Sequence, residues 1–149
     1  MNKLREMLKR HEGEKKRGKV HIMYKCGAGY NTGGYGHNID MHGFSQATAD
    51  LWLTEDTDRA KREVATLMDY YGISAWRLNV ARKDVLIDMA FCMGMKDLGG
   101  FVKMWAALQE DNFEKAADEI VDSKFGRSKF HKKRALELRE IMRKGAYSS

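Results

Sequence analysis

The first residues of the chain have an apolar spacing that is typical of a helix. Leu4, Met7 and Leu8 recur at steps of three and four, which predicts a helix over residues 2–12. Gly13 is placed to end this helix, because glycine readily adopts the left-handed conformation found after helix ends.

The pattern then changes to one typical of strands and turns. Val20, Ile22 and Tyr24 alternate with polar neighbours, which predicts a strand. The glycine-rich stretch over 26–37 excludes a stable helix and favours turns, bulges and close approach of the backbone to a ligand. We therefore expect a small β-rich lobe over about 13–50.

A long helix is predicted over about 45–71, with Ser45 as its N-cap and Gly72 at its end. It is long enough to connect two lobes. One face of this helix carries a stripe of residues at helical spacing: Trp52, Asp56, Ala60, Val64, Leu67 and Tyr71.

The remaining residues also have the patterns of helices. An apolar face runs over 85–93, a short helix is predicted over 101–108, and Asn112 is placed to cap the next one. Leu138 and Ile141 belong to a last helix. The sequence therefore predicts an α+β fold, in which a small glycine-rich sheet precedes a helical lobe.

Composition adds limits but no function. The 149 residues are 43% hydrophobic and 32% charged, which is a globular balance, and the chain is long enough to bury a core. The net charge of +6 favours polyanionic partners without choosing among nucleic acid, membrane and cell wall. The two cysteines, Cys26 and Cys92, match no zinc or redox spacing and fit a reducing cytoplasm. We expect neither a signal peptide nor a membrane helix.

Glu12 is the first candidate for chemistry. It continues the apolar stripe of Leu4 and Leu8, and it lies where the helix macrodipole disfavours negative charge. Burial and dipole both favour the protonated carboxyl, which is the form that a glycosidase needs as general acid. The same position also fits an ordinary, partly exposed glutamate at a helix end.

Two further charges interrupt apolar stripes. Asp56 does so in the long helix and Arg134 in the last helix. A charge on a buried face usually needs a partner. His37 is a candidate partner for Asp56, and Glu12 for Arg134; for Asp56 we favour a structural ion pair.

The glycine-rich stretch carries a family resemblance. Its sequence from Tyr24 to His37 resembles Y-x-D-x-x-G-x-x-T-x-G-x-G-H, the signature of the phage-type lysozymes of glycoside hydrolase family 24. It follows a helix ending in Glu12 and Gly13, as in that family. Further matches follow in the family's order over nearly the whole chain: Asp88 to Gly94, Gly99-Gly100-Phe101, Ala116-Ala117 and Arg134-Ala135.

The resemblance implies one lysozyme-like domain over 1–149, with 72–149 and 1–12 forming the helical lobe. It implies an endolysin that hydrolyses the β-1,4 bond between N-acetylmuramic acid and N-acetylglucosamine in peptidoglycan, causing host cell lysis, without cofactor or metal. We expect a monomer that accumulates in the host cytoplasm and reaches the periplasm and cell wall through a membrane lesion made by a separate holin-like protein. We expect neither nucleic-acid binding nor stable membrane insertion.

The resemblance also implies residue roles. Glu12 would protonate the glycosidic oxygen, Cys26 takes the position usually held by a catalytic aspartate, and Thr32 would help to hold the attacking water. Arg134 would pair with Glu12, and His37 with Asp56. The positions that match sugar-contacting residues of the family are Asn38, Phe91, Met104 and Glu119.

The chain departs from the family in two places. The loop between Glu12 and Cys26 is about five residues longer than in the best-known members, and it is basic. The second departure is Cys26 itself. An unperturbed thiol has a pKa near 8.5, far above that of an aspartate, so we expect a more alkaline activity optimum than in relatives with the aspartate. Lys25 would lower the thiol pKa and Glu12 would raise it. A thiolate base, a thiolate nucleophile and a neutral water-positioning thiol all stay open. Cys92 replaces a usual Asn or Gln and fits a small buried hydrophobe.

Three other functions are compatible with parts of the sequence. Cys26, His37 and His42 are near enough in sequence for a zinc site, but at no standard spacing. A dinucleotide fingerprint at 27–29 would need a helix opening at its glycines, and more glycines follow instead. A non-catalytic binder of peptidoglycan or nucleic acid would explain the basic charge. It would not explain the combination of Glu12, Thr32 and the glycine-rich stretch.

Overall fold

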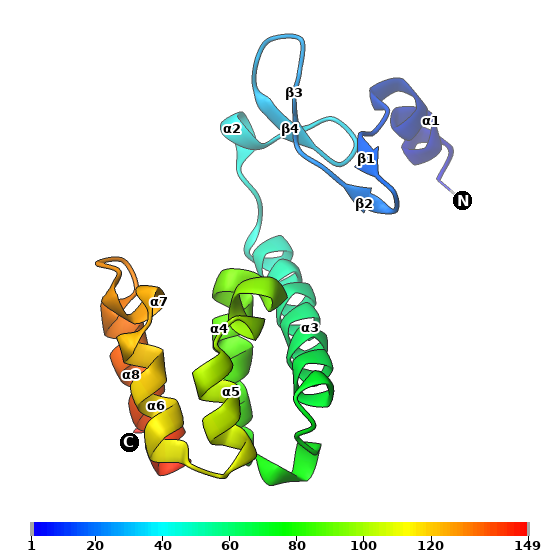
Figure 1. The fold of residues 1–149 in the computed structure, drawn as a ribbon. Helices are drawn as coiled ribbons and strands as arrows, with labels where there is room; N and C mark the ends of the chain where they lie inside the picture. Colours follow the sequence, from blue (N-terminus) through cyan, green and yellow to red (C-terminus); the bar gives the residue numbers. More distant parts are fainter. Residues whose placement is uncertain (1, 149) are drawn as a thin grey trace. The chain divides into compact units, whose positions relative to one another are not determined.

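The computed structural model describes residues 2–148, which form two compact units over 2–51 and 52–148. Short strands and short helices make up the first unit, and helices make up the second (Figure 1). The predicted α+β class is therefore confirmed, with a small antiparallel sheet region followed by a long helix and a mostly helical body. None of the helices within the described residues has the length and apolar character needed to cross a membrane.

The first unit opens with α1, Lys3–Glu12. Asn2 caps its start by accepting a hydrogen bond from the Arg5 N–H, at 3.3 Å. Gly13 ends it as predicted, with a φ of 69° and an N–H that donates to the Lys9 carbonyl. Within residues 2–51 no side chain of α1 is buried, so this unit alone does not provide the burial that the apolar stripe predicts.

Two small antiparallel sheets follow. The first pairs β1 with β2, and the second has the order β3-β4-β5, with a short helix α2 after it. Their bounds are Lys16–Arg17 (β1), Val20–His21 (β2), Tyr24–Lys25 (β3), Asn31–Gly33 (β4), His37–Asn38 (β5) and Ile39–His42 (α2). Tyr24 lies opposite Thr32, and Thr32 lies opposite Asn38.

The strand predicted through Val20, Ile22 and Tyr24 is divided between these sheets. The Ile22 N–H donates to the Lys15 carbonyl at 2.9 Å, so Ile22 extends the β1–β2 hairpin. Tyr24 pairs with β4 instead. The alternation of apolar residues continues from Ile22 to Tyr24 although the pairing strand changes from β1 to β4. The sequence pattern cannot detect this change of pairing strand.

The long helix α3 spans Gln46–Tyr70, close to the predicted 45–71. Its Ala60, Val64 and Leu67 are buried as the stripe predicts, whereas Trp52 is 44% exposed. The other elements of the helical unit are η1 (Ala75–Arg77), α4 (Val80–Gly99), α5 (Val102–Gln109), α6 (Phe113–Asp122), α7 (Lys124–Arg127) and α8 (Lys132–Lys144). Gly94, with a φ of 83°, kinks α4, and the Asn112 side chain caps α6 by accepting from the Lys115 N–H.

Helix side chains form the core of the second unit. Trp105 of α5 is fully buried, and its indole N–H donates to the Leu98 carbonyl at 3.0 Å. Its ring stacks on Tyr71, with the ring centroids 5.0 Å apart. The Leu98 carbonyl also accepts from the Phe101 N–H, so the indole gives a buried carbonyl its second donor while it fills the space between helices.

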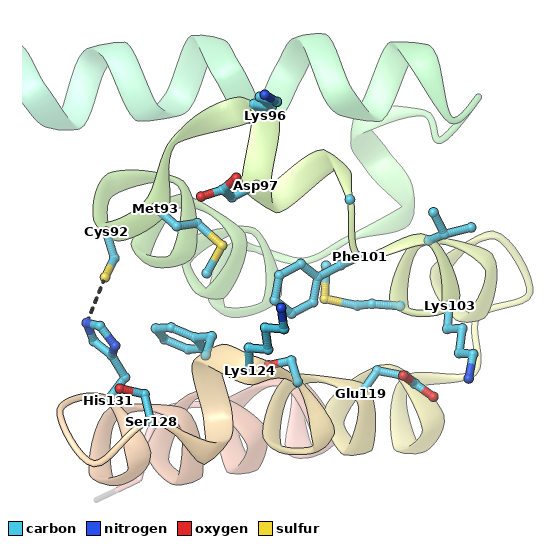
Figure 2. Close-up of a pocket in the computed structure, with 15 residues that line it drawn as sticks. Cys92, Met93, Lys96, Asp97, Phe101, Lys103, Glu119, Lys124, Ser128 and His131 are labelled. Carbon is cyan, nitrogen blue, oxygen red and sulfur yellow. Dashed lines mark hydrogen bonds between the residues drawn. The ribbon is translucent and has the colours of Figure 1, made fainter.

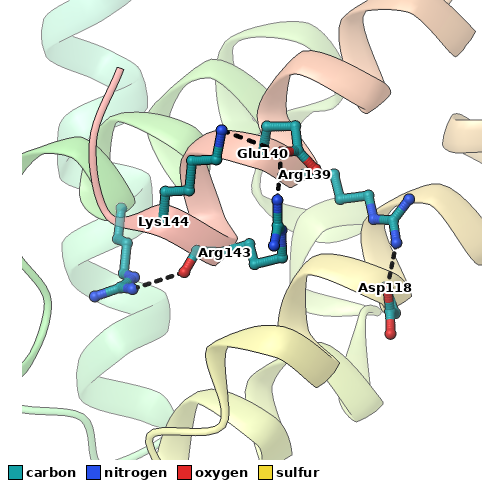
Figure 3. A network of polar contacts seen from close by, with 6 residues as sticks. Asp118, Arg139, Glu140, Arg143 and Lys144 are labelled. Atoms are coloured by element: carbon teal, nitrogen blue, oxygen red, sulfur yellow. Dashed lines mark hydrogen bonds and ion pairs between the residues drawn. The ribbon is translucent and has the colours of Figure 1, made fainter. Parts of the chain in front are cut away.

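Polar contacts connect the outer faces of α6 and α8 (Figure 3). Arg139 of α8 reaches Asp118 of α6 at 3.1 Å, and Glu140 accepts from Arg143 at 2.7 Å. Lys144 lies 3.6 Å from the same Glu140 carboxylate. The first pair joins α6 to α8, whereas the other two lie within α8. All three are partly exposed, so each contributes little to stability.

Candidate active site

Cys26 begins the tight loop that connects β3 to β4. Its N–H donates to the Tyr30 carbonyl at 2.9 Å, and its own carbonyl accepts from the Gly29 N–H at 2.8 Å. Gly29 has a φ of 85°, a conformation that residues with a Cβ rarely adopt. The loop therefore directs its backbone N–H groups back toward Cys26.

This loop changes the acidity of the Cys26 thiol. The backbone N–H groups of Ala28 and Tyr30 lower the thiol pKa from its ordinary value, and the Thr32 hydroxyl and the Gly29 N–H lower it further. Hydrogen bonds to the charged form favour that form. The sequence pointed to Lys25 as the cause, whereas the main cause in the structure is the row of main-chain donors.

Thr32 lies in the middle of the three-stranded sheet, next to this thiol. It is only 3% exposed, and its hydroxyl donates to the Tyr30 carbonyl at 3.0 Å. A hydroxyl has a single hydrogen. The Thr32 hydroxyl can therefore donate either to the Tyr30 carbonyl or to the Cys26 thiolate. When the thiolate forms, its charge favours donation to the sulfur.

Asp40 of α2 holds the residue that precedes Thr32. Its carboxylate accepts from the Asn31 N–H at 2.7 Å and from the Asn31 side-chain amide at 3.0 Å. These contacts lower the Asp40 pKa, with the backbone N–H as the largest cause. The sequence analysis missed this clamp, since the only signal for it was a polar residue in a short helix.

Glu12 lies at the exposed C-terminal end of α1, against the glycine-rich loop. Gly36 has a φ of 72°, and a Cβ at this position would overlap Oε2 of Glu12 and lie 3.0 Å from its Cδ. Glycine is therefore required here both for the backbone conformation and for the close approach to the carboxylate. Glu12, Cys26 and Thr32 all belong to the same compact unit.

The predicted supporting ion pairs would each join residues of different units. In the structure Asp56 contacts Arg59 at 3.2 Å, and Nε2 of His37 lies 2.5 Å from the Gly43 carbonyl. Arg134 donates to the Asp88 carboxylate at 2.7 Å. The Glu12–Arg134 and His37–Asp56 pairs therefore stay predictions, while Asp88 is a partner of Arg134 that the sequence analysis did not identify.

The four predicted sugar-contacting residues lie in different surroundings. Asn38 caps α2, accepting from the Met41 N–H at 3.0 Å. Phe91 is 37% exposed and lines a cavity of about 440 Å³. Met104 and Glu119 line a second cavity of about 980 Å³, and Met104 is fully buried. Their contacts with sugar stay predictions.

The larger cavity contains a pair that the sequence analysis missed. Sγ of Cys92 lies 3.5 Å from Nε2 of His131 (Figure 2). The His131 ring also stacks on Phe125, with the ring centroids 5.0 Å apart. Cys92 is half-buried in the cavity wall rather than part of the core. No local pattern predicts this contact, because 39 residues separate its two members.

The residues of the zinc alternative do not gather into a metal site in the structure. The rings of His37 and His42 lie 6.2 Å apart. Among residues 2–148, no three His, Cys, Asp or Glu side chains form a group that could hold a metal ion.

One comparison with known proteins identifies a family for this chain. The family model described as Phage lysozyme matches residues 11–140, a range that includes Glu12, Cys26, Thr32 and Arg134. A search of curated proteins finds no match. Because the family model covers well over half of the sequence, the chain belongs to the phage lysozyme family, whose activity in general is that of a peptidoglycan-hydrolysing endolysin.

Proposed function

We propose that this protein hydrolyses the β-1,4 glycosidic bond between N-acetylmuramic acid and N-acetylglucosamine in bacterial peptidoglycan, and so causes lysis of the host cell. The observation that carries the proposal is the Cys26 loop. A thiol whose ionised form is stabilised by main-chain donors and Thr32 lies in the same unit as Glu12. A glycosidase needs two such groups, one acidic and one basic, on either side of the scissile bond.

The proposed reaction inverts the anomeric centre. Glu12 gives its proton to the glycosidic oxygen as the bond from that oxygen to the anomeric carbon breaks. A water molecule next to Thr32 attacks the anomeric carbon from the opposite face, and its proton passes to the Cys26 thiolate. The products are a new hydroxyl on one sugar, a reducing end on the other, a thiol and a carboxylate, so protons and charges balance.

Direct attack by the thiolate on the sugar is the alternative for Cys26. It would form a covalent thioglycoside and release a product with retained configuration. We favour the role as base because Thr32 places a second polar group beside the sulfur, where a water molecule needs a partner. The anomeric configuration of the first product, followed by NMR, separates the two routes.

The test is lysis of outer-membrane-permeabilised Gram-negative cells, with mass analysis of the released fragments. Wild type should release reducing muropeptides, and Glu12→Gln should release none. Cys26→Asp, which restores an ionisable group, should keep far more activity than Cys26→Ser. Unchanged lysis by Glu12→Gln would overturn the proposal in favour of a binding protein. Anhydro sugars in place of reducing ends would assign the chain to transglycosylation, which uses no water.

We also propose how the enzyme reaches its substrate. It would act as a monomer in the periplasm and at the cell wall, after synthesis in the host cytoplasm and release through a lesion formed by a separate holin-like protein. Expression in a bacterial host with and without such a lesion-forming protein tests this route. Lysis that begins at the same time in both cultures would contradict it.

A further inference from the structure

The β1–β2 hairpin is a basic feature that the proposed chemistry does not use. It contains Lys15, Lys16, Arg17 and Lys19 within five residues, and all four are exposed. Gly18, with a φ of 61°, forms its turn. Like charges held this close repel one another, so the arrangement lowers stability unless an anion is nearby.

One face of the hairpin is fixed to the rest of the unit. Lys16 and His21 lie opposite each other in the ladder, and both contact Glu14, at 2.8 Å and 3.4 Å. The His21 ring also packs edge-on against Tyr35, with centroids 5.4 Å apart. Tyr35 is the neighbour of Gly36, which touches Glu12. The hairpin is therefore anchored to the loop that lies against the proposed acid.

The opposite face presents cations without a carboxylate partner. Arg17 lies opposite Val20 and so projects from the other side of the ladder than Lys16. Among the ion pairs of the described residues, neither Arg17 nor Lys19 has one, and Lys15 lies over the Tyr24 ring at 5.8 Å. Lys19 lies in the turn at the end of the hairpin, and we call Lys15, Arg17 and this turn residue the open basic face.

The short chain segment between Glu12 and Arg17 limits how far the open basic face can lie from the proposed acid. Five residues separate Arg17 from Glu12, so their Cα atoms lie within about 18 Å even for a fully extended chain. A polymer bound at Glu12 therefore passes near Arg17. Peptidoglycan carries its carboxylates on the peptides attached to every second sugar, and a guanidinium binds a carboxylate through two parallel hydrogen bonds.

We propose that the open basic face binds the peptide carboxylates of the glycan strand that occupies the active site. This inference rests on the proposed function, because it names a part of the same substrate. It assigns the hairpin to recognition of peptide-bearing glycan, and it predicts discrimination against glycan strands from which the peptides have been removed.

The test compares two double variants of equal charge. Arg17→Gln with Lys19→Gln removes two cations of the open basic face. Arg62→Gln with Lys115→Gln removes two exposed cations of the helical unit that have no ion pair among the described residues. Each double variant lowers the formal net charge by two, from +7 to +5 in the Glu12→Gln background, since 6 + 1 = 7 and 7 − 2 = 5. All are made together with Glu12→Gln, so that binding is measured without cleavage.

Binding is measured by co-sedimentation with intact peptidoglycan and with peptide-free glycan strands. We expect the hairpin variant to bind intact peptidoglycan roughly fivefold more weakly at low salt, as two exposed charge pairs allow. The difference in affinity between the hairpin variant and its parent should shrink at 1 M salt, where the Debye length is about 3 Å. The control variant should bind like the parent, and binding to peptide-free strands should not change.

Three results would overturn the inference. The first is equal weakening on both glycan forms, and the second is equal weakening in the control variant, which would indicate net charge alone. The third is loss of binding to phosphatidylglycerol vesicles with unchanged binding to peptidoglycan, which would assign the face to a membrane. Because the readout is binding, failure of cleavage by the wild type would reject the proposed function and leave this result interpretable.

Discussion

Gly36→Ala is the most direct test of how the glycine-rich loop positions Glu12. Alanine at position 36 would have to adopt a φ of 72°. Its Cβ would overlap the Glu12 carboxylate and lie 3.1 Å from the Glu12 Cβ. The backbone strain should cost about 1–2 kcal/mol of folding stability. The overlap adds little to this cost, because the end of a flexible side chain can move away.

Movement of that side chain is costly for catalysis. Relief of the overlap requires the carboxylate to shift by about 1 Å, and a misplacement of that size lowers activity by about a hundredfold. Gly34→Ala is the matched control, since Gly34 has a φ of 58° and a Cβ added there would meet open space. Both variants should therefore lose similar stability, while only Gly36→Ala loses the additional activity.

The assays are thermal unfolding and the initial rate of peptidoglycan solubilisation. Each kcal/mol lost should lower the melting temperature by about 2–4 °C for a chain of this length. Rates are compared at a temperature where both variants are folded. Equal rates for Gly34→Ala and Gly36→Ala would refute the conclusion that Gly36 is required for the position of Glu12.

Three further variants test other contacts of the structure. The rate of Cys26 alkylation should rise with pH as the thiol ionises, and this rise should occur at lower pH than in a free cysteine peptide. Thr32→Val should shift the rise to higher pH, because a hydrogen bond that lowers the thiol pKa is lost. An unshifted profile would contradict this role of Thr32. Asp40→Asn should lower stability at neutral pH, because the low Asp40 pKa marks a carboxylate stabilised in the folded state by Asn31. This difference should disappear as pH falls through that lowered pKa, and a pH-independent difference would argue against the clamp. Trp105→Phe should cost about 1–3 kcal/mol in urea unfolding, because the buried Leu98 carbonyl keeps the Phe101 N–H but loses the indole donor, and because the smaller ring leaves a gap in the core; a neutral effect would show that the indole contributes neither.

Local signals in the sequence predicted the longer helices, but not the short helices α2 and α7 or the start of α4 at Val80. Gly13 ends α1 and Asn112 caps α6 where the sequence places them, because helix caps depend on a few neighbouring residues. The buried stripe of α3 also follows from spacing alone. The division of the predicted strand at Ile22 could not be predicted, since alternation is the same whichever strand supplies the partner.

The candidate site was predictable only in part, for a related reason. Residue types and spacing point to Glu12, Cys26 and Thr32, and the glycines predict a close approach of the backbone, which occurs between Gly36 and Glu12. The contact of Cys92 with His131 joins distant parts of the chain, so no local window contains it. The cause of the lowered Cys26 pKa was also hidden, because main-chain groups leave no trace in composition.

The main-chain origin of the donors around Cys26 has a consequence for engineering. An alanine scan of the loop would leave every one of these donors in place, because each amino acid except proline supplies the same N–H. Outside Gly29, whose φ of 85° disfavours alanine, such a scan would report a tolerant segment and overlook the groups that govern the thiol. Proline or ester substitutions, which delete a single amide hydrogen, would measure them one at a time. The side chains of Ala28 and Tyr30 are thus free to be redesigned for substrate contact while their N–H groups preserve the chemistry of the sulfur.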